Sequence, residues 1–368
     1  SGGLDSSSIC YFANQVSKND LAFFTIDAGQ NVDEQQSDLP YARHVANHLG
    51  VELNIIPVKS QNFVEKLERM VLHLGEPIAD PAALNTLIIC EAAREKGIKV
   101  MLSGTGGDDI FTGYRRHIIP RYSQFIKSYI KPCEGILRSS LNMFDRIGLS
   151  NRRIKKLHNG LFLNGDDRMV EYFFWTSASQ VKSILNEQFQ NNISHEQMAQ
   201  PLKDYLISLP NELTDLEKAL LLEQKFFMTN HNLIYGDRMS MAAGVEMRVP
   251  FLDPRIIELA SKIPDKFLQK GLTGKWILKK SMEPFLPNKI IYRSKTGFGL
   301  PVRDWMHDAL EELVDTHLSS FALQRYEVFN AKKVSELIKS FQQNYTGEAY
   351  TLLAIACIQI WCSQTFGP

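Results

Sequence analysis

The chain contains 368 residues, which is long enough to bury a large hydrophobic core and to divide into two structural units. Hydrophobic residues make up 44% and charged residues 22% of the sequence, as in ordinary globular proteins. Lysine plus arginine and aspartate plus glutamate both number 41, so the overall charge gives no reason to expect nucleic acid as a partner. The cysteines show no CxxC pair and no metal-type spacing, which is typical of reduced thiols in a cytoplasmic protein. They are Cys10, Cys90, Cys133, Cys357 and Cys362.

The first eight residues, Ser1-Gly2-Gly3-Leu4-Asp5-Ser6-Ser7-Ser8, combine two glycines with an acid and a run of hydroxyl groups. Apolar residues at helical spacing follow and predict an amphipathic helix; they are Ile9, Phe12, Ala13 and Val16. A glycine-rich turn that opens a helix offers unpaired N–H groups to a phosphate. Asp5 would repel that phosphate unless Mg²⁺ lay between them. The alternative is an ordinary glycine turn with a serine N-cap.

Strand-like and helix-like segments alternate through the first third of the chain, which predicts an α/β fold with a parallel sheet flanked by helices. The strands are expected at 21–27, 51–58 and 98–102, and the helices at 40–49, from Ser60 onward and at 82–96. The first of these strands reads as buried, and the sheet should be covered on both faces. The helix after Ser60 has one apolar face, formed by Phe63, Leu67, Met70 and Leu74. A phosphate loop normally follows a strand, so a further strand is expected upstream of Ser1.

A second glycine-rich stretch, Ser103-Gly104-Thr105-Gly106-Gly107-Asp108-Asp109, comes directly after the expected strand at 98–102 and before Gly113-Tyr114. Ligands of parallel sheets bind at the carboxyl ends of the strands, which is where this stretch should lie. Two adjacent acids are costly there unless a cation neutralises them. Asp5 and Asp108 together would hold Mg²⁺ on a pyrophosphate. As a glycine and aspartate loop alone, the stretch would be a surface turn.

The chain from about Pro120 onward is predicted to be mainly helical. Helices are expected at 216–233, 256–260, 276–281, 310–318, 334–341 and 349–366. The last is apolar but carries Gln359, so we expect a buried helix rather than a membrane span. The basic cluster at 152–156 is better explained by a solvated helix face than by nucleic-acid binding. We therefore expect an α/β unit at 1–120 and a mainly helical part at 121–368 that completes the site.

Two further stretches carry charges in unusual settings. In 237–253, charged and apolar residues alternate, which favours a structural role in which buried Arg238 and Arg248 pair with nearby acids and brace the two units. In 293–301, Lys295 lies in a glycine-flanked loop, where an ammonium group can close over a phosphate. Arg293 is the next candidate for that cation. A basic surface loop is the alternative for this stretch.

Four motifs occur in order: SGGLDSS, SGTGGDDIFTGY, DRMSMA with EMRVPFLD, and RSKTGFGLPVRDW. Together they resemble the synthetase domain of glutamine-dependent asparagine synthetases over nearly the whole chain. The first motif is similar to the SGGxDS pyrophosphate loop of the ATP pyrophosphatases and lacks the lysine of the Walker pattern. The resemblance implies a fold of the adenine nucleotide alpha hydrolase type. It also implies a reaction in which a carboxylate, aspartate by default, attacks the α-phosphorus of ATP, and ammonia then displaces AMP from the acyl-adenylate.

The resemblance assigns roles to single residues. It implies that ATP and its pyrophosphate contact Ser1, Gly2, Gly3, Asp5, Ser6, Ser7, Ile26 and Gly104. Asp5 and Asp108 match the magnesium ligands, so ATP and Mg²⁺ are the expected cofactors. Lys295 matches the lysine that stabilises the adenylation transition state. Asp109 and Tyr114 match further catalytic positions of the same motif.

Two departures from the family pattern leave alternatives open. Thr105 stands where the family usually has an acid near the substrate, which puts aspartate as the acceptor in question. The family also carries an upstream glutaminase domain that supplies ammonia, and this domain is expected in the full-length protein. Other acceptors include a sugar uronate, or an internal amine as in β-lactam and lasso-peptide cyclases. A degenerate nucleotide-binding module is the non-enzymatic alternative. The resemblance also allows a homodimer, with no nucleic-acid or membrane partner.

Overall fold

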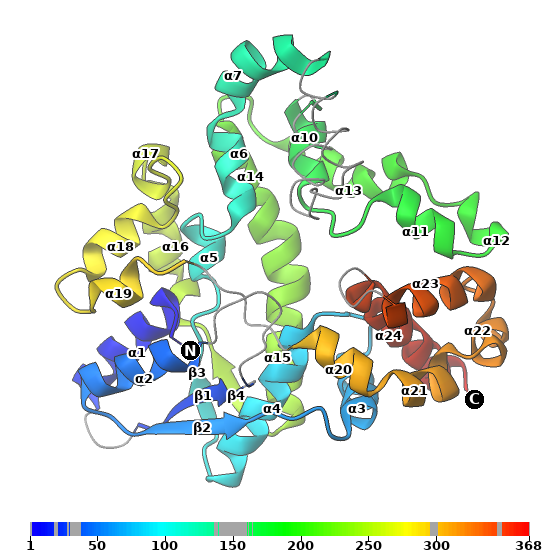
Figure 1. Ribbon diagram of the computed structural model, residues 1–368. Coiled ribbons are helices and arrows are strands. Elements are labelled where there is room, and N and C mark those ends of the chain that lie inside the picture. The colour runs from blue at the N-terminus through cyan, green and yellow to red at the C-terminus, as the bar shows by residue number, and fades with distance from the viewer. Residues whose placement is uncertain are drawn as a thin grey trace.

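The computed structural model describes residues 2–17, 21–27, 29, 38–135, 139, 160, 162–163, 165–294, 301–343 and 348–367. Its first third alternates helices with short parallel strands, and the remainder is mainly helical (Figure 1). The expected α/β class is therefore confirmed at this coarse level. The elements of the first third are α1 (Leu4–Val16), β1 (Phe23–Asp27), α2 (Leu39–Leu49), β2 (Leu53–Pro57), α3 (Phe63–Leu74), α4 (Pro81–Glu95), β3 (Val100–Leu102) and α5 (Gly107–Ile110).

The described strands form two parallel pairs rather than one continuous sheet. β1 pairs with β2 in the register Phe23 to Leu53, and β3 pairs with β4 (Glu246–Arg248) in the register Val100 to Glu246. The second pair joins the first third of the chain to a segment almost 150 positions further on. The prediction of buried strands was wrong in detail, because only Thr25 of β1 is buried and Val100 of β3 is 42% exposed.

Helix α1 packs differently from the amphipathic prediction. Its buried residues are Leu4, Ser7 and Ser8, whereas Phe12 and Val16 are 50% and 88% exposed. Leu4 packs against a small cluster from the C-terminal half that includes Met282. The helix is thus anchored by its first two turns, next to the glycine loop, and its apolar C-terminal turns remain at the surface.

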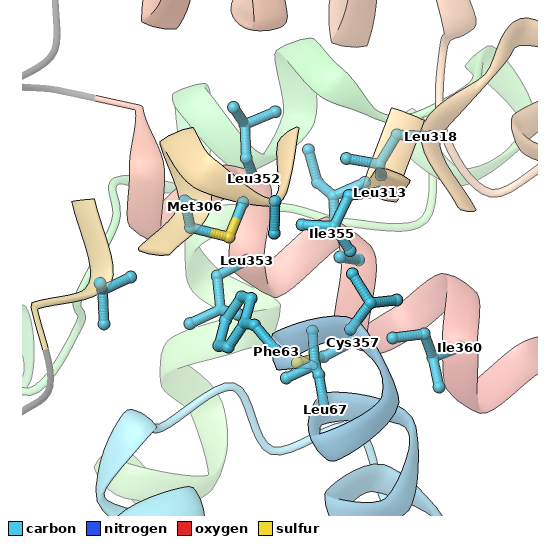
Figure 2. Packing of buried hydrophobic residues seen from close by; sticks show 14 of the residues in the cluster. Phe63, Leu67, Met306, Leu313, Leu318, Leu352, Leu353, Ile355, Cys357 and Ile360 are labelled. Atoms are coloured by element: carbon cyan, nitrogen blue, oxygen red, sulfur yellow. The ribbon is translucent and has the colours of Figure 1, made fainter. Parts of the chain in front are cut away.

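Helix α3 shows the predicted apolar face, because Phe63, Leu67, Met70 and Leu74 are all at most 3% exposed. The helix starts later than predicted, because α3 begins after Asn62 rather than at Ser60. Figure 2 shows Phe63 and Leu67 facing Leu353, Cys357 and Ile360 of the terminal helix α24 (Ala349–Phe366). α24 is long and apolar enough to cross a membrane, but half of it is buried inside the protein, where it packs in the main core as expected.

A long helical segment passes through the centre of the molecule (Figure 1). It consists of α14 (Asp215–Leu222), a π-helical segment η4 (Glu223–Asn232) and α15 (Leu233–Ala242). A capping box starts it, in which Glu217 N–H donates to Thr214 Oγ1 at 3.1 Å and Thr214 N–H donates to Glu217 Oε2 at 2.7 Å. The predicted helix at 216–233 was therefore too short. π-helical segments often mark functional sites, and η4 packs against α5.

The other described helices follow in chain order. They are η1 (Arg115–His117), α6 (Ile118–Arg121), α7 (Ser123–Phe125), η2 (Ile126–Ile130), η3 (Lys131–Cys133), α10 (Gly165–Glu171), α11 (Ala178–Ile184), α12 (Glu187–Gln190), α13 (His195–Ser208), η5 (Pro250–Leu252), α16 (Pro254–Ser261), α17 (Asp265–Leu268), α18 (Trp276–Met282), α19 (Asn288–Ile291), α20 (Val302–Asp308), α21 (Leu310–Leu313), η6 (Val314–Leu318), α22 (Ser320–Tyr326) and α23 (Ala331–Gln343). The basic cluster at 152–156 lies outside the described residues.

The expected buried ion pairs at 237–253 are not found. Arg248 pairs with Glu246 at 2.8 Å on β4, and both side chains are more than half exposed. Arg238 lies 3.7 Å from Glu76, also near the surface. The stretch runs from helix α15 into strand β4. The pair of Arg248 stays within β4, and the pair of Arg238 with Glu76 joins the two parts of the chain at the surface rather than in the interior.

Candidate active site

The glycine loop at the start of the chain is held tightly against α2. A Cβ atom on Gly2 would lie 2.3 Å from Cβ of Tyr41 and 2.6 Å from the backbone nitrogen of Ala42. Gly2 is therefore required for this packing, whatever the loop binds. Ser7 is fully buried, and Ser6 Oγ donates to the carbonyl of Gly3 at 3.4 Å. Ser1 lies outside the described residues.

The second glycine loop closes directly onto the first. A Cβ atom on Gly104 would lie 2.7 Å from the backbone nitrogen of Ser6, and one on Gly107 would lie 2.7 Å from Cγ of Asp5. Only glycines allow the two loops to approach this closely. The structure thus brings together the two stretches that the sequence singled out, although about 100 positions separate them.

Lys275 lies between the carboxylates of the two loops. Its Nζ atom is 2.5 Å from Oδ2 of Asp5 and 2.5 Å from Oδ1 of Asp108, and its side chain is 9% exposed. Burial acts to lower the pKa of Lys275, but the two carboxylates outweigh it and raise the pKa above its ordinary value. The ammonium group therefore stays charged and neutralises part of the negative charge at this point.

The backbone around Lys275 fixes its position. Its N–H donates to the carbonyl of Phe111 at 2.9 Å, and its φ is +54°. A Cβ atom on Gly113 would lie 1.8 Å from Oδ1 of Asp108 and 2.3 Å from Cε of Lys275. Sequence reasoning missed Lys275. The signal was present, because a glycine precedes this lysine directly before α18.

Asp109 and Tyr114 lie together beside this cluster. Asp109 is 1% exposed, and its Oδ1 accepts from the Tyr114 hydroxyl at 3.5 Å and from Nδ2 of Asn232 at 3.3 Å. Burial, and next the charge of Asp109, raise the pKa of Tyr114 well above 10. The phenol therefore remains protonated at neutral pH and acts as a hydrogen-bond donor. The structure thus brings these two predicted site residues together, with Asn232 as an unpredicted third member.

A buried ion cluster of Glu223, Arg116 and His117 lies next to Tyr114. Glu223 is fully buried and pairs with the guanidinium of Arg116, and its Oε2 lies 3.1 Å from Nε2 of His117. Burial acts to raise the pKa of Glu223, but the bonds from His117 and Arg116 outweigh it and lower the pKa below its ordinary value. The Arg116 guanidinium also lies 4.4 Å from the ring centre of Tyr114 and 4.4 Å from that of Phe227. These contacts fix the ring of Tyr114 in place.

The sequence pattern of the family described as asparagine synthase matches residues 1–363. The chain belongs to the asparagine synthase family. It is 27% identical over 365 residues to the glutamine-hydrolysing asparagine synthetase 1 of Bacillus subtilis, covering 99% of this chain and 55% of that protein. It is 28% identical over 306 residues to a putative asparagine synthetase of Mycobacterium tuberculosis, covering 83% of this chain and 45% of that protein. The amidase chyE of Penicillium rubens is 25% identical over 360 residues, with 85% of this chain and 51% of that protein covered.

This member of the asparagine synthase family spans about half the length of the curated relatives it matches. Three predicted site residues remain, of which the structure describes Thr105 and Ile26. Thr105 carries no charge and lies 2.9 Å, oxygen to oxygen, from the hydroxyl of Ser103. Ile26 is partly buried near the carboxyl end of β1. Lys295 lies outside the described residues.

Arg293, the other cation considered for this family site, faces the glycine loop. Its Nη1 donates to the carbonyl of Gly2 at 3.0 Å, and its Nη2 lies 2.8 Å from Oδ1 of Asp38. The guanidinium also stacks 3.9 Å from the ring centre of Tyr41. With its side chain 7% exposed, Arg293 holds the loop in place.

Among the described residues, no group of three or more His, Cys, Asp and Glu side chains is arranged to hold a metal ion. Two carboxylates, from Asp5 and Asp108, do converge on one buried cation. Mg²⁺ is usually held by one or two carboxylates together with substrate phosphates and water. The donor set therefore fits Mg²⁺ brought with a nucleotide.

Proposed function

We propose that this chain is an ATP-dependent amide-forming synthetase. It activates a carboxylate as an acyl-adenylate, releases pyrophosphate, and then forms an amide with ammonia. The observation that carries the proposal is the convergence of Asp5 and Asp108 on Lys275, beside two glycine loops. Membership of the asparagine synthase family supports the reaction class.

The charges of this cluster suit a nucleotide with its metal. Asp5 and Asp108 would hold Mg²⁺, which supplies neutralisation of the charge that develops on the departing pyrophosphate. Lys275, which lies between the same two carboxylates, would contact that pyrophosphate in the loaded site. Lys295 remains our candidate for the cation that meets the α-phosphoryl oxygens in the adenylation transition state.

Asp109 and Tyr114 are assigned to the ammonia step. Attack of ammonia on the acyl carbon breaks the bond to AMP and releases one proton. A buried carboxylate that accepts hydrogen bonds from a phenol and an amide is a suitable group to orient the amine and take its proton. Both side chains are held rigidly, which favours a productive geometry.

The nucleotide position follows from the same resemblance. Ile26 and Gly104 would line the adenosine, and Gly2, Gly3, Ser6 and Ser7 would line the phosphates.

The fold would then be that of the ATP pyrophosphatases, with an α/β unit at 1–120 completed by the helical part at 121–368. In the cell we place the protein in the cytoplasm, with an upstream glutaminase domain as the ammonia source and a homodimer as its assembly.

Aspartate is the default acceptor, since it is the one implied by the names of the relatives. Thr105 favours a second candidate, the amidation of a different carboxylate, because its hydroxyl cannot neutralise a substrate ammonium as an acid would. A degenerate module is disfavoured, since the charged cluster of Asp5, Asp108 and Lys275 is intact.

The test is exchange of labelled pyrophosphate into ATP in the presence of Mg²⁺ and a panel of acids. The panel should contain aspartate, N-acetylaspartate, uronates and β-amino acids, with no acid as the control. Exchange that depends on one class of acid would support the proposal and identify the acceptor. Absence of exchange with every acid, from a protein that still binds ATP, would contradict it.

A further inference from the structure

A series of polar contacts leads from Asp80, at the start of α4, to the Asp109 and Tyr114 pair. Asp80 Oδ2 lies 3.3 Å from Nε2 of His231, and Nδ1 of His231 lies 3.1 Å from Oδ1 of Asn232. The Nδ2 atom of Asn232 then donates to Oδ1 of Asp109 and to the hydroxyl oxygen of Tyr114, at 3.3 Å each. Asp80 is the N-cap of α4, and His231 and Asn232 lie on η4. Asn232 is the residue that reaches the two site residues.

The carboxylate of Asp109 fixes the direction of the bonds that Asn232 makes. A carboxylate cannot donate, so the side of Asn232 that faces Asp109 must be its NH₂ group. The amide oxygen of Asn232 therefore faces His231, and Nδ1 of that ring must donate to it. The other ring nitrogen, Nε2, lies 3.3 Å from the Asp80 carboxylate. His231 consequently orients the amide, and the amide orients the two site residues.

Neighbouring aromatic rings and a helix cap fix the positions of His231 and Asp80. The ring of His231 stacks on Phe227 with centroids 4.7 Å apart and meets Tyr235 edge to face at 5.4 Å. Asp80 is the N-cap of α4, where its Oδ1 accepts from the backbone N–H of Ala82 at 2.8 Å. Asn232 is 7% exposed, so water competes weakly for its amide.

The donor and acceptor pattern favours a role beyond packing. Asn232 ends a π-helical segment, where the widened turn directs its side chain toward α5 rather than into the apolar core. Burying an amide costs free energy, and an apolar residue would fill this place without that cost. Both donors of Asn232 are directed at the two residues assigned to the ammonia step.

We propose that Asn232 and His231 are positioning residues for the ammonia step. They hold the Asp109 carboxylate and the Tyr114 hydroxyl toward the amine. Asp80 holds the ring of His231 at the other end of these contacts. This inference rests on the proposed function, since it names how that site orients its second substrate. Neither residue contacts the Asp5, Asp108 and Lys275 cluster in any described contact, so adenylation should be largely independent of them.

The first test compares Asn232→Leu with Asn230→Leu, the same change at an exposed position of the same helical segment. Each protein is assayed for amide formation with ammonium and for pyrophosphate exchange with the acceptor found for the wild type. We expect Asn232→Leu to lower amide formation about 10- to 100-fold and to change exchange less than threefold. Asn230→Leu should match the wild type in both assays. Unchanged amide formation in Asn232→Leu, or an equal loss of exchange, would overturn the proposal.

The second test separates orientation from folding at a partly exposed position. His231→Asn keeps a donor close to the place of Nδ1, whereas His231→Gln keeps one close to the place of Nε2. We expect His231→Asn to retain most amide formation and His231→Gln to lose about tenfold, with similar thermal unfolding midpoints. Equal activities of the two variants would contradict the orientation of Asn232 by His231. A wild type without exchange would instead reject the proposed function, and it would do so before either variant is made.

Discussion

The ammonium group of Lys275 lies 2.5 Å from the carboxylate of Asp5, although 270 positions separate the two residues in the sequence. The contact joins the first helix of the chain to the start of α18. It forms because Gly107 and Gly113 leave room for the side chains that meet there. The candidate site is therefore assembled from segments that lie far apart in the chain, and no single motif contains it.

Replacing Gly113 by alanine should separate the charges of this cluster. The added methyl group would meet Oδ1 of Asp108 at 1.8 Å and Cε of Lys275 at 2.3 Å, so both side chains must move. We expect pyrophosphate exchange to fall about 100-fold. Gly135→Ala is the control, because no atom of the described residues lies within 4 Å of its added Cβ atom. Normal exchange by Gly113→Ala would show that the arrangement of these charges is unimportant.

Glu223→Gln should destabilise the protein in a pH-dependent way. Glu223 is fully buried between Arg116 and His117, and breaking such a cluster costs about 3–5 kcal/mol. Its folded-state pKa lies below the ordinary value of 4.5, so its stabilising effect is present above pH 4.5 and is lost as the pH falls below that value. The gap in thermal unfolding midpoint between wild type and variant should therefore narrow from pH 7 to pH 3.5.

The control for this prediction is Glu336→Gln, which removes a half-exposed surface partner of Lys333. It should change the midpoint little at either pH. A gap between wild type and Glu223→Gln that stayed constant across this range would place the effect outside the ionisation of Glu223.

Arg293→Met should weaken ATP binding by loosening the glycine loop. The variant loses the bond to the carbonyl of Gly2, the pair with Asp38 and the stacking on Tyr41. Hydrogen bonds from a charged group contribute about 1.5–3 kcal/mol, so we expect the Kd for ATP to rise about 10- to 100-fold. Arg293→Lys should not restore binding, because an ammonium group lacks the planar fork. Full rescue by lysine would mean that Arg293 acts as a charge alone.

The sequence predicted the alternation of strands and helices, the buried face of α3 and the meeting of Asp5 with Asp108. These features depend on local periodicity and on residues whose chemistry is informative by itself. It did not predict β4, because three residues with two charged side chains carry no strand signal. Lys275 and Asn232 were missed for a related reason. Each is an ordinary residue type whose role comes from partners more than 100 positions away.

The amphipathic prediction for α1 shows the opposite error. Phe12 and Val16 have the spacing of a core face, yet they are exposed, and the buried positions are taken by Leu4 and the serines near the loop. Periodicity shows which side chains are apolar, but it does not show which part of the helix is buried. In the fold the first turns of α1 are buried, because the glycine loop next to them belongs to the candidate site.

The most direct test of the central claim is pyrophosphate exchange by Lys275→Met, compared with the wild type and with Lys280→Met. Lys280 lies on the same helix α18 but at its exposed surface, where it pairs with Glu283. If Asp5, Lys275 and Asp108 form the pyrophosphate site, Lys275→Met should lower exchange about 10²- to 10³-fold while Lys280→Met stays near wild type. Circular dichroism would confirm that both variants are folded. Wild-type exchange by a folded Lys275→Met protein would contradict the account.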